Sequence, residues 1–169
     1  MSEERRLRIA TQIATVLGVG RVPTAPGTAG SIVALPFAWV IAAFGGRFAL
    51  MLAAILVLGI GAWACEVYAR ANGKDDPSEC VIDELAGQWF ACSFCLLPFG
   101  GLVPVPQAIS LPAFGLAFAL FRLFDIWKPW PVSWADQNLK GGLGVMTDDM
   151  IAGGMAGVLV VIARLVFHI

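Results

Sequence analysis

Charged residues are scarce in this chain of 169 residues, since Asp, Glu, Lys and Arg together make up only 14% of it. Hydrophobic residues make up 59%, and the mean hydropathy is +0.81. A soluble domain commonly has about a quarter of its residues charged, so this composition excludes one and predicts a protein embedded in a membrane. Linker-like stretches rich in proline, serine or charge are also missing, and we therefore expect residues 1–169 to form a single membrane domain.

Basic residues are too few and too dispersed for a nucleic-acid-binding face, because the net charge is −1 and acidic and basic residues are interleaved. Nucleic acid is excluded as a partner on this ground, and an oligomer is not indicated. Cysteine pairs with the spacing of metal ligands are also lacking, because Cys92 and Cys95 form the only C-x-x-C and no histidine is near. We interpret these two cysteines as small helix residues rather than as a zinc or redox site.

Long apolar runs are present instead, and they predict an all-α, polytopic helical bundle. A full crossing needs about 20 residues, and several runs are shorter. The first run contains Pro36 and is followed by Gly45 and Gly46, so we expect a half-span or tilted helix there. The expected total is about four to five membrane helices. The runs are Ser31–Phe44, Phe48–Ala64, Leu85–Val103, Ile109–Phe124 and Met150–Phe167.

The charges predict the orientation of the bundle. With the N-terminus in the cytoplasm, most Lys and Arg residues fall inside, as the positive-inside rule requires. Residues 1–30 then form a cytoplasmic amphipathic segment, residues 31–169 form the bundle, and all twelve acidic residues fall on the cytoplasmic side. Short outer loops, Gly45–Arg47 and Pro104–Ala108, leave little room for charge and are one explanation of this asymmetry. A site that faces the cytoplasm is the other, and it is the one we adopt.

Five carboxylates fall at predicted helix ends. Asp83 and Glu84 open the third run, Asp125 closes the fourth, and Asp148 and Asp149 open the fifth. They would lie at one depth, and two carboxylates about 4 Å apart repel by roughly 4 kcal/mol at an effective dielectric of about 20, so their convergence requires protons or a cation. Oxygen ligands without histidine or thiolate favour Mg²⁺, Mn²⁺ or Ca²⁺. The alternative for any single carboxylate is helix capping.

Groups suited to bind phosphate lie near the same boundary. The stretch Pro23–Ser31 leads into the first run, and its backbone N–H groups, with the hydroxyls of Thr28 and Ser31, would form an anion cradle. At the end of the fourth run, Arg122 would clamp a phosphate and Lys128 would neutralise it. The alternatives are an ordinary helix entry for the stretch and cations that snorkel to the membrane edge.

Nucleophiles for covalent phosphoryl transfer are absent. The single histidine, His168, lies at the far end of the last run, and no cysteine has a C-x5-R relation to an arginine. No D-x-D precedes a turn, as it does in enzymes that form an aspartyl phosphate. The chemistry that remains is attack on phosphorus by a metal-held water.

Four motifs follow one another from residue 26 to residue 153: PGTAGS at 26–31, DELAGQW at 83–89, FRLFDIWKPWP at 121–131 and GGLGVMTDDMIAG at 141–153. Together and in this order, they resemble the motifs of the phosphatidylglycerophosphatase A family. The resemblance implies a bacterial inner-membrane enzyme that hydrolyses phosphatidylglycerophosphate to phosphatidylglycerol and phosphate with Mg²⁺. Gln137 stands where the family often has a basic residue after the aspartate that matches Asp136, so Asp136 is not assigned to the site.

The combined interpretation is a multi-pass, metal-dependent phosphoric monoester hydrolase whose active site faces the cytoplasm while the substrate's lipid tails stay in the bilayer. Asp75, in the loop Lys74–Glu79, is expected to be solvated. Two other classes are weighed: a carboxylate-lined ion transporter, whose acids should spread through the membrane depth, and a phosphatidyltransferase, whose D-G-x2-A-R signature is missing. The expected Mg²⁺ ligands are Asp83, Glu84, Asp125, Asp148 and Asp149, all but Asp148 also expected to be catalytic, and the expected phosphate-binding residues are Thr28, Ser31, Arg122 and Lys128.

Overall fold

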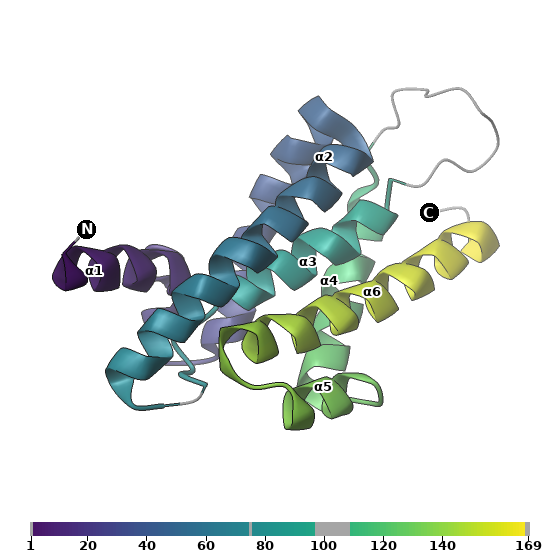
Figure 1. The fold of residues 1–169 in the computed structure, drawn as a ribbon. Coiled ribbons are helices and arrows are strands. Elements are labelled where there is room, and N and C mark those ends of the chain that lie inside the picture. The colour runs from purple at the N-terminus through teal and green to yellow at the C-terminus, as the bar shows by residue number, and fades with distance from the viewer. Residues whose placement is uncertain (1, 75, 97–108, 168–169) are drawn as a thin grey trace.

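A computed structural model describes residues 2–74, 76–96 and 109–167 (Figure 1). The predictions for Asp75, for the outer loop Pro104–Ala108 and for His168 fall outside these residues. So does the far end of the run Leu85–Val103.

Every regular element within the described residues is a helix, which confirms the all-α class. A short 3-10 turn, Val19–Arg21, follows the first helix. The α-helices are α1 (Glu3–Ala14), α2 (Pro26–Asn72), α3 (Ile82–Phe94), α4 (Leu111–Trp127), α5 (Val132–Asn138) and α6 (Gly141–Phe167).

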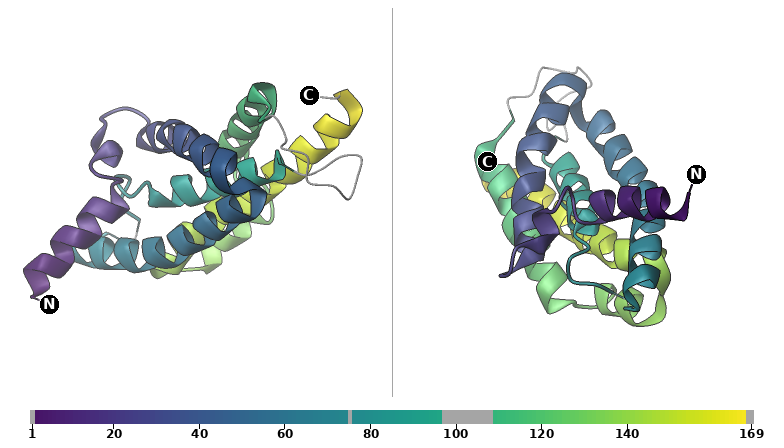
Figure 2. Two further views of the ribbon diagram at one scale, coloured as in Figure 1. Left: turned by 90° about the horizontal axis from the view of Figure 1, so that it is seen from above. Right: turned by 90° about the vertical axis from the view of Figure 1, so that its left-hand side faces the viewer.

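Helix α2 contains both of the first two apolar runs, which the sequence separates. Its 47 residues are interrupted by non-helical backbone at Gly46, where φ is 66°. A positive φ is open to glycine at no steric cost, so the chain reverses there. Figures 1 and 2 show the two arms of α2 lying side by side. Pro36 is accommodated inside the first arm.

Two of the described helices, α2 and α6, are long and apolar enough to cross a membrane. Helices α3 and α4 have 13 and 17 residues in the described part of the chain and fall short of that length, so the bundle of four to five spans is not confirmed. Large apolar side chains nevertheless point outward, since Phe44 and Phe48 are 91% and 73% exposed. Such surface suits lipid rather than water, and we describe the chain as a membrane protein.

Helix α3 is the central element and packs against α2, α4 and α6 (Figure 1). Its crossing with α6 is close because glycines face each other: a Cβ atom added to Gly153 would lie 2.3 Å from the carbonyl oxygen of Gly87. Small residues allow such backbone-to-backbone approach in membrane helices. The crossing fixes the ends of α3 and α6 relative to each other.

The segment before α3 is held by contacts with two other helices, α1 and α2. A disulfide joins Cys65, in the second arm of α2, to Cys80, with a Cα–Cα distance of 6.4 Å. Next to it, the N–H of Val81 donates to the carbonyl oxygen of Ala14 at 2.9 Å. A spacing of 15 residues between two cysteines does not by itself predict this disulfide. Cys92 and Cys95 are buried free thiols.

Candidate active site

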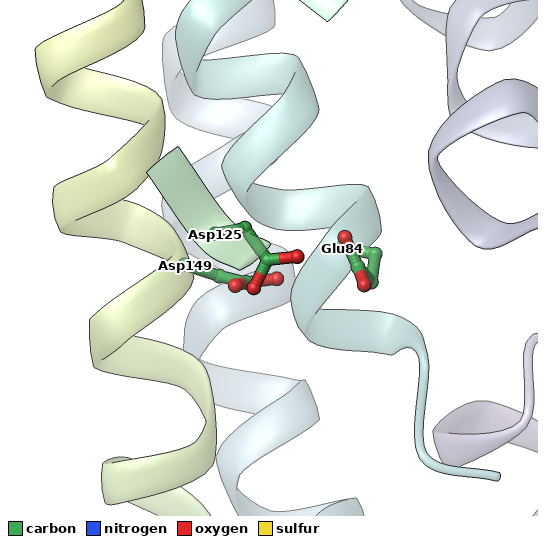
Figure 3. A group of neighbouring side chains, drawn as sticks. All are labelled: Glu84, Asp125 and Asp149. Atoms are coloured by element: carbon green, nitrogen blue, oxygen red, sulfur yellow. The ribbon is translucent and has the colours of Figure 1, made fainter. Parts of the chain in front are cut away.

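Glu84, Asp125 and Asp149 come from three different helices and converge on one region of the bundle (Figure 3). Asp83 and Glu84 lie in the first turn of α3, and Asp125 lies in the last turn of α4. The expectation that Asp148 and Asp149 open their helix is wrong, because α6 begins at Gly141 and carries them two turns further along. They reach the other acids because α6 crosses α3 at Gly153, one turn after Asp149.

Three of the carboxylates form a compact, largely buried cluster. Ligand oxygens of Glu84, Asp125 and Asp149 all lie within 4.8 Å of one another. Glu84 and Asp149 are only 7% and 3% exposed, and Oδ2 of Asp149 is buried without a hydrogen-bond partner in the described structure. A buried, unpartnered carboxylate oxygen is costly unless a cation or a donor meets it. The donor set therefore fits a hard divalent cation with oxygen ligands.

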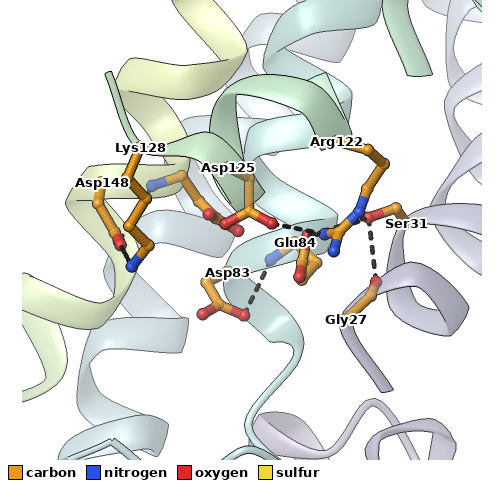
Figure 4. Close-up of polar contacts among 9 residues, drawn as sticks. Gly27, Ser31, Asp83, Glu84, Arg122, Asp125, Lys128 and Asp148 are labelled. Atoms are coloured by element: carbon orange, nitrogen blue, oxygen red, sulfur yellow. Dashed lines mark hydrogen bonds and ion pairs between the residues drawn. The ribbon is translucent and has the colours of Figure 1, made fainter. Parts of the chain in front are cut away.

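Arg122 is the cation nearest to this cluster (Figure 4). Its Nη1 pairs with Glu84 and, at 2.8 Å, with Oδ2 of Asp125. The Nε–H group of the same guanidinium is buried without a partner. One positive charge offsets only part of three negative charges, so the cluster has an unmet demand for a cation.

The N-terminal turn of α2 holds Glu84 in place. Ser31 donates through its hydroxyl to Glu84 Oε2 at 2.9 Å. A Cβ atom added to Gly27 would lie 2.0 Å from Glu84 Oε1, so any larger residue there would displace the Glu84 carboxylate. The N-terminus of a helix favours an anion, and here that anion is the carboxylate of Glu84.

The predicted anion cradle is therefore changed in its details. Its residues begin α2 at Pro26 rather than forming a loop that leads into Ser31. Ser31 is fully buried and bonds to Glu84, and Thr28 does not line the cavity beside the cluster. In the described structure neither Ser31 nor Thr28 lines that cavity, so either would influence it only through neighbouring residues.

Lys128 forms a second charged group beside the first. It ends α4 in a left-handed conformation, and its Nζ pairs with Asp136 and, at 2.9 Å, with Asp148 Oδ2. Burial alone would lower the pKa of Lys128, but the hydrogen bonds to Asp136 and Asp148 outweigh burial and hold that pKa above its usual value. Lys128 thus keeps its charge. Asp136, which sequence analysis did not assign, is part of this group.

A cavity of about 290 Å³ opens between the two charged groups. All five predicted acids line it, together with both predicted cations and with Asp76, which the sequence reading had left unassigned. Asp76 gave no signal because the polar loop before α3 predicts only solvated residues. The polar residues of the wall are Asp76, Ser78, Asp83, Glu84, Arg122, Asp125, Lys128, Asp148 and Asp149.

Comparison with known proteins identifies the same family that the sequence motifs resemble. The family model for phosphatidylglycerophosphatase A matches residues 12–164. A phosphatidylglycerophosphatase A of Escherichia coli is 36% identical over 148 residues, which cover 87% of this chain and 79% of that protein. One from Haemophilus influenzae is 31% identical over 88% of this chain and 84% of its own length.

A protein of Bacteroides thetaiotaomicron named a putative phosphatidylinositol-3-phosphatase is 39% identical over 158 residues, covering 90% of this chain and 91% of the relative. No solved structure matches the chain. The family model covers the motifs that line the cavity, from Pro26 in α2 to Asp149 in α6. The chain belongs to the phosphatidylglycerophosphatase A family.

Proposed function

We propose that this chain is a Mg²⁺-dependent phosphatidylglycerophosphatase, which hydrolyses the terminal phosphomonoester of phosphatidylglycerophosphate to give phosphatidylglycerol and phosphate. The observation that carries this proposal is the buried cluster of Glu84, Asp125 and Asp149, whose ligand oxygens lie within 4.8 Å of one another. The cluster lies beside a cavity whose wall also includes two basic side chains, those of Arg122 and Lys128. Family membership supports this reaction, and the cluster is where we propose that it takes place.

The proposed Mg²⁺ ligands are the three cluster carboxylates, with Asp83 and Asp148 as further acids of the same cavity. Oxygen-only coordination suits Mg²⁺, which typically binds through one or two carboxylates and substrate phosphate oxygens. When bound, Mg²⁺ supplies Lewis-acid stabilisation of phosphoryl oxygens and lowers the pKa of a coordinated water. The unpartnered Oδ2 of Asp149 is the atom that most needs this ion.

The chain's own groups orient the phosphate and move the proton. Arg122 offers its unpartnered Nε–H to a phosphoryl oxygen while Nη1 stays on Glu84 and Asp125. The ammonium of Lys128 stands at the other side of the cavity and offsets the charge that develops in the transition state. A cluster carboxylate accepts the proton of the attacking water. In this proposal Ser31 acts by holding Glu84, and Thr28, which does not line the cavity, makes no direct contact with the phosphate.

The proposed setting is the bacterial inner membrane, with about four to five crossings, the site facing the cytoplasm and the acyl chains of the substrate in the bilayer. Three exposed tryptophans near the site support this depth: Trp127, Trp130 and Trp134 are 70%, 78% and 52% exposed. Tryptophan is enriched at the boundary between lipid and water.

A 3-phosphorylated inositol headgroup is the second candidate substrate, because the Bacteroides relative bears that name. An ion transporter is less well supported, since acids of the cavity gather at one end of the helices rather than along a path through the membrane.

Phosphate release by the purified protein in detergent tests the proposal. The substrates are phosphatidylglycerophosphate, phosphatidylinositol 3-phosphate and phosphatidic acid, each with Mg²⁺, with chelator, and with Mg²⁺ restored after chelation. We expect fastest turnover of phosphatidylglycerophosphate, its loss with chelator and its recovery with Mg²⁺. Preferred turnover of the inositol lipid would select the second candidate, and metal-independent turnover would contradict the assigned cofactor.

A further inference from the structure

A second, smaller cavity adjoins the proposed active site. It measures about 190 Å³ and lies between the end of α5 and the beginning of α6. The two cavities share Asp76, Val145 and Asp148 in their walls. The Lys128–Asp148 ion pair lies where the two cavities meet, because Asp148 lines both of them and Lys128 lines the larger one.

The walls of the smaller cavity combine hydrogen-bond acceptors and donors. Asp76 and Asp136 offer carboxylate oxygens, while Gln137 and Lys140 offer N–H groups. Among the described residues, the side chains of Gln137 and Lys140 have no side-chain partner. This mixture of donors and acceptors suits an uncharged group with a hydroxyl, which both donates and accepts a hydrogen bond.

We propose that the smaller cavity binds the hydroxyl-bearing glycerol unit of the headgroup, the part between the phosphate that is released and the phosphodiester that is kept. This inference rests on the proposed function and names the element that selects the substrate class. A hydrogen bond between this hydroxyl and the cavity wall adds affinity. Phosphatidic acid has no such hydroxyl and cannot make that bond, so it would be discriminated against.

Size and surroundings agree with this assignment. Pockets for drug-sized ligands commonly measure about 300–1,000 Å³, so a cavity of about 190 Å³ takes a three-carbon unit such as this glycerol rather than acyl chains. Apolar surface for the lipid part lies on the same helices, where Trp134 of α5 and Leu143 of α6 are 52% and 64% exposed.

The decisive variant is Gln137→Ala, with Asn138→Ala as its matched control. Both amides belong to α5 and are exposed, but Asn138 donates to the carbonyl oxygen of Trp134 at 2.7 Å and does not line the cavity. The measurements are the KM for phosphatidylglycerophosphate, the inhibition constant of the product phosphatidylglycerol, and the inhibition constant of inorganic phosphate. A thermal melt of each variant checks folding.

For Gln137→Ala we expect KM and the phosphatidylglycerol inhibition constant to rise about tenfold, the effect of one lost hydrogen bond. The inhibition constant of inorganic phosphate should change less than about twofold, because phosphate occupies the larger cavity, and Asn138→Ala should match the wild type in all three. An unchanged phosphatidylglycerol constant, or equal shifts for both inhibitors, would overturn the inference while leaving the proposed function intact. Absence of phosphate release by the wild type would instead refute the proposed function and this inference with it.

Discussion

Asp149→Asn tests whether the carboxylate cluster exists to hold a metal. The amide keeps the shape of the side chain and removes one negative charge. Asp149 is 3% exposed, and its oxygens share a space of 4.8 Å with those of Glu84 and Asp125. A structural role and a metal-binding role predict opposite signs for the change in stability without metal.

The magnitudes follow from that spacing. Two unit charges 4.8 Å apart repel by about 3.5 kcal/mol at an effective dielectric of about 20. Asp149 has two such neighbours, and Arg122 offsets part of the repulsion. In chelator, Asp149→Asn should therefore leave the Tm unchanged or raise it. With Mg²⁺ at about 100 times its Kd, binding stabilises the wild type by about 2.7 kcal/mol, and the variant should lose most of that gain.

The assay is thermal unfolding in detergent with chelator and with Mg²⁺, together with phosphate release from phosphatidylglycerophosphate. Turnover of Asp149→Asn should fall by about 100-fold or more, comparable to removing one group that stabilises the transition state. Glu3→Gln, at an exposed acid in the first turn of α1, is the control and should behave as the wild type. The reasoning is refuted if Asp149→Asn lowers the Tm in chelator, or keeps both its turnover and its stabilisation by Mg²⁺.

Three further predictions concern the frame of the site. A reporter fused after Glu3 should be active only in the cytoplasm, since the excess of Lys and Arg puts the N-terminus there; periplasmic activity would reverse the proposed orientation. Replacing Cys65 and Cys80 by Ala should cost up to about 3 kcal/mol of stability, the chain-entropy value for a 15-residue loop. Turnover at low temperature should stay within about threefold of the wild type, and a large loss of turnover in folded protein would show that the disulfide positions the site. Gly153→Ala should cost about 1–3 kcal/mol by overpacking because its Cβ would lie 2.3 Å from a backbone oxygen, whereas Gly59→Ala, which meets no atom within 4 Å, should melt close to the wild type; equal melts would contradict the close crossing.

Hydropathy and charge were sufficient to predict an all-helical membrane protein and to nominate Glu84, Asp125 and Asp149. Charge is expensive in lipid, so acids at the ends of apolar runs are confined to one boundary. The same reasoning nominated Arg122 and Lys128, which the structure places on either side of the cavity. The roles of all these residues remain predictions.

Contacts between distant segments explain what the sequence could not predict. The glycines from Gly141 to Gly144 indicate a loop because glycine is a poor helix former, yet they begin α6, and a Cβ atom on Gly142 would lie 1.8 Å from the carbonyl oxygen of Ala62. Tertiary packing selects glycine there. Asp136 meets Lys128 only because α5 folds back beside the end of α4 (Figure 1). The local sequence pattern does not predict that turn.

The crossing at Gly87 and Gly153 also bears on which ion the proposed metal site would accept. With backbone against backbone, α3 and α6 have no side-chain layer that could thin or thicken between them. The distance between Glu84 and Asp149 therefore has little freedom to adjust to ionic radius. Ca²⁺ prefers oxygen ligands at about 2.3–2.6 Å and a larger, looser shell than the octahedron of Mg²⁺ at about 2.0–2.1 Å. A rigid frame of this kind discriminates by size, and we expect Ca²⁺ to support much less turnover than Mg²⁺ does.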